Sequence, residues 1–323
     1  EAIAALLGGA PAPDIRRLAF LDTETTGLAG GTGTCVFLVG IGTFEEGAFR
    51  VRQHFLPAPD RERAMLRLVA RELEGTEGLV TYNGRAFDIP ALQTRMVIQR
   101  LPFGAAALPH FDLLLAMRRL YRNRLPSLRL GEAESRLLGV RRENDIAGHL
   151  IPSIYFDWVR AGRLGPLRAV LRHNETDILS LVSILSFAAD LFSRPDLDPA
   201  DLILLARWWE HRDEPVRAEA IYESAVPRLE EGPDWQWAAR RYAILLKRSG
   251  SRGNAVGLWR RLWARGDIEA GIEVAKYLEH EARDLPAAEE VTSAVLGGAP
   301  GPRRAELEHR LSRIRRKLCR APV

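Results

Sequence analysis

Two carboxylates, Asp22 and Glu24, follow directly after the apolar run 18–21. A short apolar run of this kind predicts a buried strand. Residues i and i+2 of a strand point to the same face, so both carboxylates should project together at the strand's end. Neighbouring negative charges repel, and a fold retains them where a cation lies between them. Oxygen ligands favour Mg²⁺ or Mn²⁺. The alternative is an ordinary strand end with two solvated acids.

The bulk composition describes a globular chain. A length of 323 residues predicts about two domains, and 46% hydrophobic with 27% charged residues is typical of a soluble protein. Cys35 and Cys319 are too far apart in sequence for a disulfide framework or a metal knuckle, which favours a reducing cytoplasm. No apolar run is long enough to cross a membrane. The net charge of +4 permits nucleic acid as a partner without requiring it.

The first residues, 1–13, lack the basic segment of a signal peptide. The chain also starts without Met, which is consistent with a missing N-terminal piece. We therefore expect a cytoplasmic protein.

The first half of the chain predicts an α/β fold. After the first strand, a glycine-rich turn at 28–34 leads to strands at 35–42 and 49–55, a helix at 61–73 and a strand at 79–82. Three strands joined by short turns predict an antiparallel meander, and the later alternation predicts a mixed sheet with helices on its faces. The glycine-rich turn has two interpretations, a phosphate contact or a plain hairpin loop.

A second polar cluster lies at residues 81–95. The chain turns through Asn83 and Gly84, and Asp88 opens a helix, where it could serve as a helix cap or as a metal ligand. Further on, Asp112 also precedes a helical segment. For Asp112 we favour the cap over membership of the acidic cluster.

A third cluster lies in the segment 167–185, whose apolar stripe predicts a helix. His173 and Asp177 are four residues apart and therefore share one face of that helix. An acid on a helix can complete a metal site begun on a strand, and a neighbouring histidine can take a proton from water. The alternative is a surface pair of little consequence. Further helices are expected at 125–138, capped by Ser127, and at 151–161.

These clusters resemble the motifs of a known nuclease family. Asp22-x-Glu24 with the following Thr-Thr-Gly-Leu resembles the first motif of the DEDD 3′→5′ exonucleases, which belong to the RNase H-like superfamily. The segment 82–95 is similar to the second exonuclease motif in the proofreading domain of family B DNA polymerases. One DEDD branch has His five residues before the last Asp, and the other has Tyr four before it. His173 stands at the four-residue spacing, which departs from both and resembles the bacterial YprB-like branch.

The resemblance implies an RNase H-like domain over residues 1–195 and a two-metal reaction. Two divalent ions, Mg²⁺ or Mn²⁺, would be held by four acids, and His173 would be the general base. The implied metal ligands are Asp22, Glu24, Asp88 and Asp177. The residues implied to bind substrate are Thr25, Thr26, Gly27, Leu28, Asn83 and Phe87.

The implied activity is hydrolysis of phosphodiester bonds in single-stranded nucleic acid from a 3′ end, with DNA slightly favoured over RNA. One alternative is a degenerate nuclease fold that acts as a scaffold, although the presence of all four acids argues against degeneracy. Another is a structure-specific endonuclease, because a two-metal site does not itself require a strand end.

The last third of the chain, 196–323, predicts an all-α region that begins at the Pro-rich boundary 194–199. Its helical segments carry a faint repeat of Ala-x-x-x-(Tyr/Trp/Thr) at 218–222, 255–259 and 288–292, and these offsets bracket the tetratricopeptide period. We predict a tetratricopeptide-like tail that binds a protein partner. The many tryptophans are expected to pack between helices, and the segment 303–320 should form a final helix with a basic outer face.

Overall fold

The computed structural model describes residue 6 and residues 14–27, 32–122, 124–142, 145–194 and 196–319. The predictions for residues 1–13, for Leu28 and for most of the glycine-rich turn lie outside these ranges. The chain divides into two compact units, Glu1–Pro195 and Asp196–Val323, and each is described by itself. Among the described residues no helix is both long and apolar enough to span a membrane.

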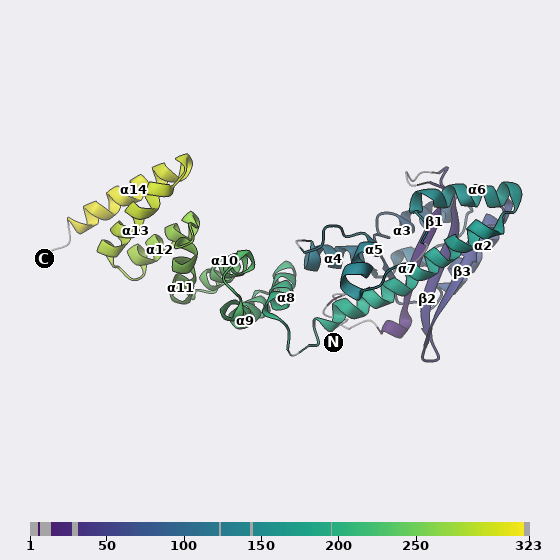
Figure 1. The fold of residues 1–323 in the computed structure, drawn as a ribbon, viewed down its shortest axis with the longest axis horizontal. Helices are drawn as coiled ribbons and strands as arrows, with labels where there is room; N and C mark the ends of the chain where they lie inside the picture. The colour runs from purple at the N-terminus through teal and green to yellow at the C-terminus, as the bar shows by residue number, and fades with distance from the viewer. Residues whose placement is uncertain are drawn as a thin grey trace. The chain divides into compact units, whose positions relative to one another are not determined.

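The first unit is built on a five-stranded sheet in the order β3-β2-β1-β4-β5 (Figure 1). β1 pairs antiparallel with β2, and β2 with β3, whereas β1–β4 and β4–β5 are parallel. The predicted meander and mixed sheet are therefore confirmed. The strands are β1 (Leu18–Thr25), β2 (Val36–Glu45), β3 (Ala48–Phe55), β4 (Gly78–Thr81) and β5 (His110–Asp112).

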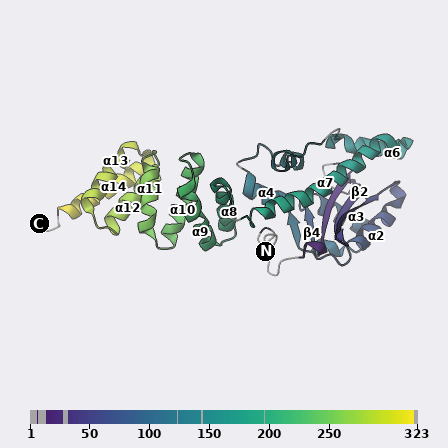
Figure 2. The ribbon, with the colours of Figure 1, turned by 60° about the horizontal axis from the view of Figure 1, so that its bottom comes forward.

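Helices cover both faces of this sheet. Figure 2 shows α7 on one side of the strands and α2 and α3 on the other, and α7 contacts β1, β2 and β3. The longer helices are α2 (Glu62–Glu72), α3 (Asp88–Ile98), α4 (Leu113–Tyr121), α6 (Ile151–Ala161) and α7 (Leu164–Asp190). Shorter helical segments are η1 (Ile15–Arg17), η2 (Pro59–Arg61), η3 (Gly104–Ala107), α5 (Leu130–Ala133), the π-helix η4 (Glu134–Leu138) and η5 (Gly148–Leu150).

Two glycines let α7 approach the sheet closely. A Cβ added to Gly40 would lie 2.3 Å from Asn174 Oδ1, and one added to Gly42 would lie 2.7 Å from a methyl carbon of Ile178. Real Cβ atoms do not approach other atoms that closely, so the helix can sit at this height only over residues without side chains. Gly40 is paired with Asp22 across the β1–β2 ladder. The close approach therefore places α7 directly over the acidic end of β1.

One sequence prediction about a helix start is wrong. The helix expected at 125–138 begins only at Leu130, and Ser127 does not cap it, although Ser127 Oγ accepts a hydrogen bond from the Arg129 amide. Asp88 opens α3, as predicted, and the alternative role of a cap does not apply, because its carboxylate accepts hydrogen bonds from Thr23 instead. Asp112 does cap α4, through Leu114 N, as predicted.

The second unit is all helical, as predicted, and its helices pack in sequence along the chain. Its helices are α8 (Pro199–His211), α9 (Pro215–Ala225), α10 (Pro233–Arg248), α11 (Arg252–Trp263), α12 (Ile268–His280), α13 (Leu285–Gly298) and α14 (Gly301–Leu318), with a short η6 (Val226–Arg228). All six positions of the faint repeat are buried: Ala218, Tyr222, Ala255, Trp259, Ala288 and Thr292. The tryptophans of this unit lie in its core or partly buried against it, as expected.

Candidate active site

The end of β1 carries Asp22 and Glu24, and α3 brings Asp88 to the residue between them. Asp88 Oδ1 accepts hydrogen bonds from the Thr23 amide at 3.0 Å and from Thr23 Oγ1 at 2.6 Å. Thr23 points to the opposite face of the strand from its two neighbours. Its bonds to Asp88 therefore fix the first turn of α3 against the acidic end of the sheet.

Asp22 is held from the other face by α7. Asn174 Nδ2 donates a hydrogen bond to Asp22 Oδ2 at 2.9 Å, and Asn174 Oδ1 accepts one from Gln53 Nε2 at 2.9 Å. Asn174 is fully buried. Asn174 was not among the residues predicted from the sequence, although its position directly after His173 on a predicted site helix was a usable signal. Its amide fixes the orientation of the Asp22 carboxylate.

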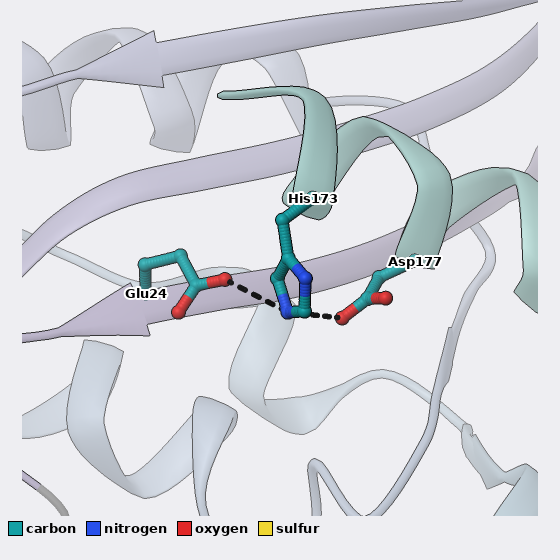
Figure 3. A group of neighbouring side chains, drawn as sticks. All are labelled: Glu24, His173 and Asp177. Carbon is teal, nitrogen blue, oxygen red and sulfur yellow. Dashed lines mark ion pairs between the residues drawn. The ribbon is translucent and has the colours of Figure 1, made fainter. Parts of the chain in front are cut away.

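His173 lies between Glu24 and Asp177 (Figure 3). Its Nε2 is 3.9 Å from Glu24 Oε1 and 3.6 Å from Asp177 Oδ2. Its Nδ1 is 2.7 Å from Asp145 Oδ1, so the proton on Nδ1 is donated to that carboxylate. A hydrogen bond of this kind fixes the ring and leaves the other nitrogen to act on a proton or a ligand. The predicted pairing of His173 with Asp177 is thus present, with Asp145 as a third member that the sequence analysis missed.

Burial raises the pKa of each of the four acids, and for Asp22 and Glu24 the charges of the other acids raise it further. Burial first, and then the charges of Asp177, Asp88 and Glu24, hold the pKa of Asp22 well above its usual range. Burial and the charges of Asp177 and Asp88 raise the pKa of Glu24 to about 8. The pKa of Asp88 rises to about 6 through burial, against the opposing hydrogen bonds from Thr23.

Asp177 differs because cations lie beside it. Burial raises its pKa, while the nearby charges of His173 and Arg142 oppose that rise. Arg142 Nη2 lies 2.5 Å from Asp177 Oδ1, and the same guanidinium pairs with the buried Glu134 of η4 and, at 3.2 Å, with Asp145. Arg142 lies in a segment without periodicity, so no local signal marked it. Its contact fixes one Asp177 oxygen and leaves Oδ2 turned toward His173.

The acids fit divalent metal ions by their chemistry. Glu24, His173 and Asp177 each offer a ligand atom, and these atoms lie within 4.8 Å of one another. The charges of neighbouring acids raise the pKa values of Asp22 and Glu24, and a hard cation with oxygen ligands relieves that repulsion. Asp22 is oriented by Asn174 and Asp177 by Arg142, which is the kind of support that metal ligands require.

A cavity of about 370 Å³, here called the α3 cavity, opens beside these acids. Four of the residues predicted to bind substrate line it: Thr25, Gly27, Asn83 and Phe87. Asn83 adopts a left-handed conformation, with φ of 69°, which asparagine tolerates. Phe87 is 55% exposed, an unusual state for a large apolar side chain.

The remaining predicted residues of the motifs lie elsewhere. Thr26 exchanges hydrogen bonds with the Cys35 backbone, at 2.9 Å in both directions, and is not among the residues that line the α3 cavity. Arg95, at the end of the second motif, forms a 2.5 Å ion pair with the buried Glu62 and is therefore structural. His110 is half-buried and lies 2.8 Å from Thr81 Oγ1, which makes it a packing residue.

Comparisons with known proteins identify the superfamily of this chain. The chain is 35% identical over 316 residues to a protein of Bacillus subtilis (strain 168) named "Uncharacterized protein YprB", covering 93% of this chain and 75% of that protein. Among solved structures, it is similar to a family B DNA polymerase from the hyperthermophilic archaeon Pyrobaculum calidifontis, with 17% identity and a TM-score of 0.43, covering 72% of this chain but only 29% of the polymerase. A family model described as RNase_H superfamily matches residues 19–188. The chain therefore belongs to the RNase_H superfamily.

Proposed function

We propose that this protein is a metal-dependent 3′→5′ exonuclease of the DEDD type, which hydrolyses phosphodiester bonds of single-stranded nucleic acid, with DNA preferred over RNA. The observation that carries the proposal is the clustering of Asp22, Glu24, Asp88 and Asp177, together with a histidine that lies between Glu24 and Asp177 and whose other ring nitrogen is held by Asp145. A nuclease-type function is also supported by membership of the RNase_H superfamily.

The residues divide the chemistry between them. Asp22, Glu24 and Asp177 would hold one Mg²⁺ or Mn²⁺, and Asp22 with Asp88 a second; bound there, the ions would activate water and stabilise the leaving oxygen. His173 Nε2 accepts the proton of the attacking water, and Asp145 stabilises the imidazolium that results. Asn174 keeps the Asp22 carboxylate from rotating, so the ligands need no rearrangement during the reaction.

The substrate residues and the second unit complete the proposal. Thr25, Gly27, Asn83 and Phe87 contact the bound strand in the α3 cavity. The nuclease domain comprises residues 1–195, and residues 196–323 form a tetratricopeptide-like unit that binds a protein partner. The protein acts in the cytoplasm.

The decisive experiment incubates the protein with 5′-labelled single-stranded DNA and RNA in Mn²⁺, Mg²⁺ or EDTA, beside Asp22→Ala. We expect a metal-dependent ladder that shortens from the 3′ end, faster on DNA, and no ladder from the variant. A circular single strand serves as the control, because an exonuclease leaves it intact and an endonuclease opens it. Intact linear substrate under every condition would refute the proposal and favour a scaffold role.

A further inference from the structure

A second cavity, of about 630 Å³ and here called the α7 cavity, adjoins the same acids. The α3 cavity extends from these acids toward Asp88 and Phe87, whereas the α7 cavity extends toward His173 and Asp177. The lining residues that the two cavities share are Asp22, Thr23, Glu24, Gly148 and Ile151. A strand whose scissile phosphate lies at the acids can therefore place the nucleotide on one side of that phosphate in the α3 cavity and the nucleotide on the other side in the α7 cavity.

The two cavities differ in charge. Among the described residues that line the α3 cavity there is no arginine, lysine or histidine, and its lining beyond the acids is uncharged. The α7 cavity is lined by Arg129 and His149 in addition to His173. The uncharged cavity suits a nucleoside, while the basic one suits a further phosphate.

Arg129 is free to make that contact. It precedes α5, its side chain is exposed, and it forms no ion pair with any residue in the described part of the chain. Arg142, the other arginine near the acids, is already engaged by Glu134, Asp145 and Asp177. The guanidinium of Arg129 is thus the permanent positive charge that this cavity offers to an incoming anion.

We propose that the α3 cavity receives the terminal nucleoside of the substrate and that Arg129 binds the phosphate next to the scissile one, in the body of the strand. His149 also lines the α7 cavity. The inference rests on the exonuclease function proposed above and deepens it by assigning the direction of the strand. Each phosphate in the body of the strand is negatively charged and is repelled by the four carboxylates, so a cation beside that part of the strand favours binding. The terminal nucleoside is uncharged and needs no such cation.

A kinetic comparison tests this assignment. The p-nitrophenyl ester of thymidine 5′-monophosphate carries the nucleoside and the scissile phosphate but has a nitrophenyl group where the strand body would be. In Arg129→Gln, we expect the ratio of kcat/KM on an oligonucleotide to kcat/KM on this ester to fall about tenfold, mainly through the KM of the oligonucleotide, since one charge-assisted phosphate contact is lost. In Phe87→Ala, both substrates should lose kcat/KM together.

Arg136→Gln is the matched control. Arg136 lies in the neighbouring η4, is exposed, pairs with Glu132 at 2.9 Å and lines neither cavity. Its loss should leave the ratio unchanged. An unchanged ratio in Arg129→Gln, or an equal fall on both substrates, would overturn the assignment.

Binding gives a second readout that needs no turnover. With Ca²⁺ in place of Mg²⁺, the affinity for a labelled oligonucleotide is measured over a range of salt. Loss of one phosphate contact to a single strand lowers the slope of log affinity against log salt by about 0.7, and we expect this change in Arg129→Gln and not in Arg136→Gln. If the wild-type protein hydrolyses neither substrate, the proposed function fails, while the salt slope still decides whether Arg129 contacts the strand.

Discussion

Glu24 should destabilise the folded protein whenever no metal is bound. Its side chain is only 13% exposed, and burial with the charges of Asp177 and Asp88 raises its pKa from 4.5 to about 8. For a group whose folded pKa is raised, the favourable contribution is complete below the unfolded pKa and is lost as the pH rises through the folded one. The metal-free protein should therefore lose stability between pH 4.5 and about 8. Glu24→Gln removes the charge while keeping the shape.

The size of the effect follows from that shift. The unfolded pKa of Glu24 is 4.5 and the folded pKa is about 8, so pH 7 lies about 2.5 units above the unfolded pKa and below the folded one. Each of these units lowers the free energy of unfolding by about 1.36 kcal/mol, which gives a loss of about 3 kcal/mol. For a domain of this size, 1 kcal/mol changes Tm by about 2–4 °C. In EDTA near neutral pH, we therefore expect Glu24→Gln to melt about 6–12 °C above the wild type, with the difference vanishing toward about pH 4.

Calorimetry and tryptophan fluorescence together isolate the effect. Six of the seven tryptophans lie in the second unit, so fluorescence mainly follows the melting of that unit and should not change. The calorimetric transition of the first unit should shift. Mn²⁺ at about 1,000 times its Kd should reverse the order, because it stabilises the native protein by about 4.1 kcal/mol, more than the loss of about 3 kcal/mol caused by the Glu24 charge, and the variant lacks one of the metal's ligands. A Glu24→Gln protein that melts at or below the wild type in EDTA would refute the reasoning.

Four other substitutions, one of them also combined with a compensating change, test the site. Asp22→Ala and Asp177→Asn should each abolish cleavage in the ladder assay while far-ultraviolet circular dichroism stays native, and full activity in either would remove that acid from the site. His173→Ala should lower kcat by about 10²–10⁴-fold if it is the general base; a near-normal single-turnover rate would point to another base. Arg142→Met leaves the buried Glu134 carboxylate without its partner and should lower the free energy of unfolding, measured with denaturant, by about 3–5 kcal/mol. The double variant Arg142→Met with Glu134→Gln should recover part of that loss, and no recovery would contradict the pairing.

The sequence predicted those parts of the site that local patterns specify. The alternation on β1 placed Asp22 and Glu24 on one face, and the helical spacing put His173 and Asp177 together. The second placement agrees with the close approach of Glu24, His173 and Asp177, and the first with the contacts that both strand acids make with α7, Asp22 with Asn174 and Glu24 with His173. The mixed sheet followed equally from short turns and alternating elements.

The parts that could not be predicted depend on contacts between distant segments. Arg142 and Asp145 lie in a stretch without regular spacing, and only the fold brings them to α7. The hydrogen-bond partner of Asp88 is a related case. A cap is the usual role of an aspartate at a helix start, yet here Thr23, 65 residues away, takes the Asp88 carboxylate. Tertiary hydrogen bonds thus replaced the local role at the position where the site is assembled.

Gly40 provides the sharpest test of how the fold positions the acids. A methyl group at this position would lie 2.3 Å from Asn174 Oδ1 and 3.0 Å from Ile178, both on α7. Either the Asn174 amide must turn away from Asp22 or the helix must rise from the sheet, and both movements disturb the acid cluster. Overpacking of this kind costs about 1–3 kcal/mol. We expect Gly40→Ala to lose that much stability and, because Asp22 loses its partner, to lose kcat as well.

Gly165→Ala supplies the matched control, on the helix α7 that packs over Gly40. Gly165 lies in the first turn of α7, and a Cβ there would meet nothing within 4 Å. Alanine in an open helical position stabilises by about 0.5–1 kcal/mol relative to glycine, so this variant should melt slightly higher and cleave normally. If Gly40→Ala also cleaved normally at a temperature where it is fully folded, then the height of α7 over the sheet would not set the geometry of Asp22. The acid cluster would in that case owe its arrangement to Thr23 and Arg142 alone.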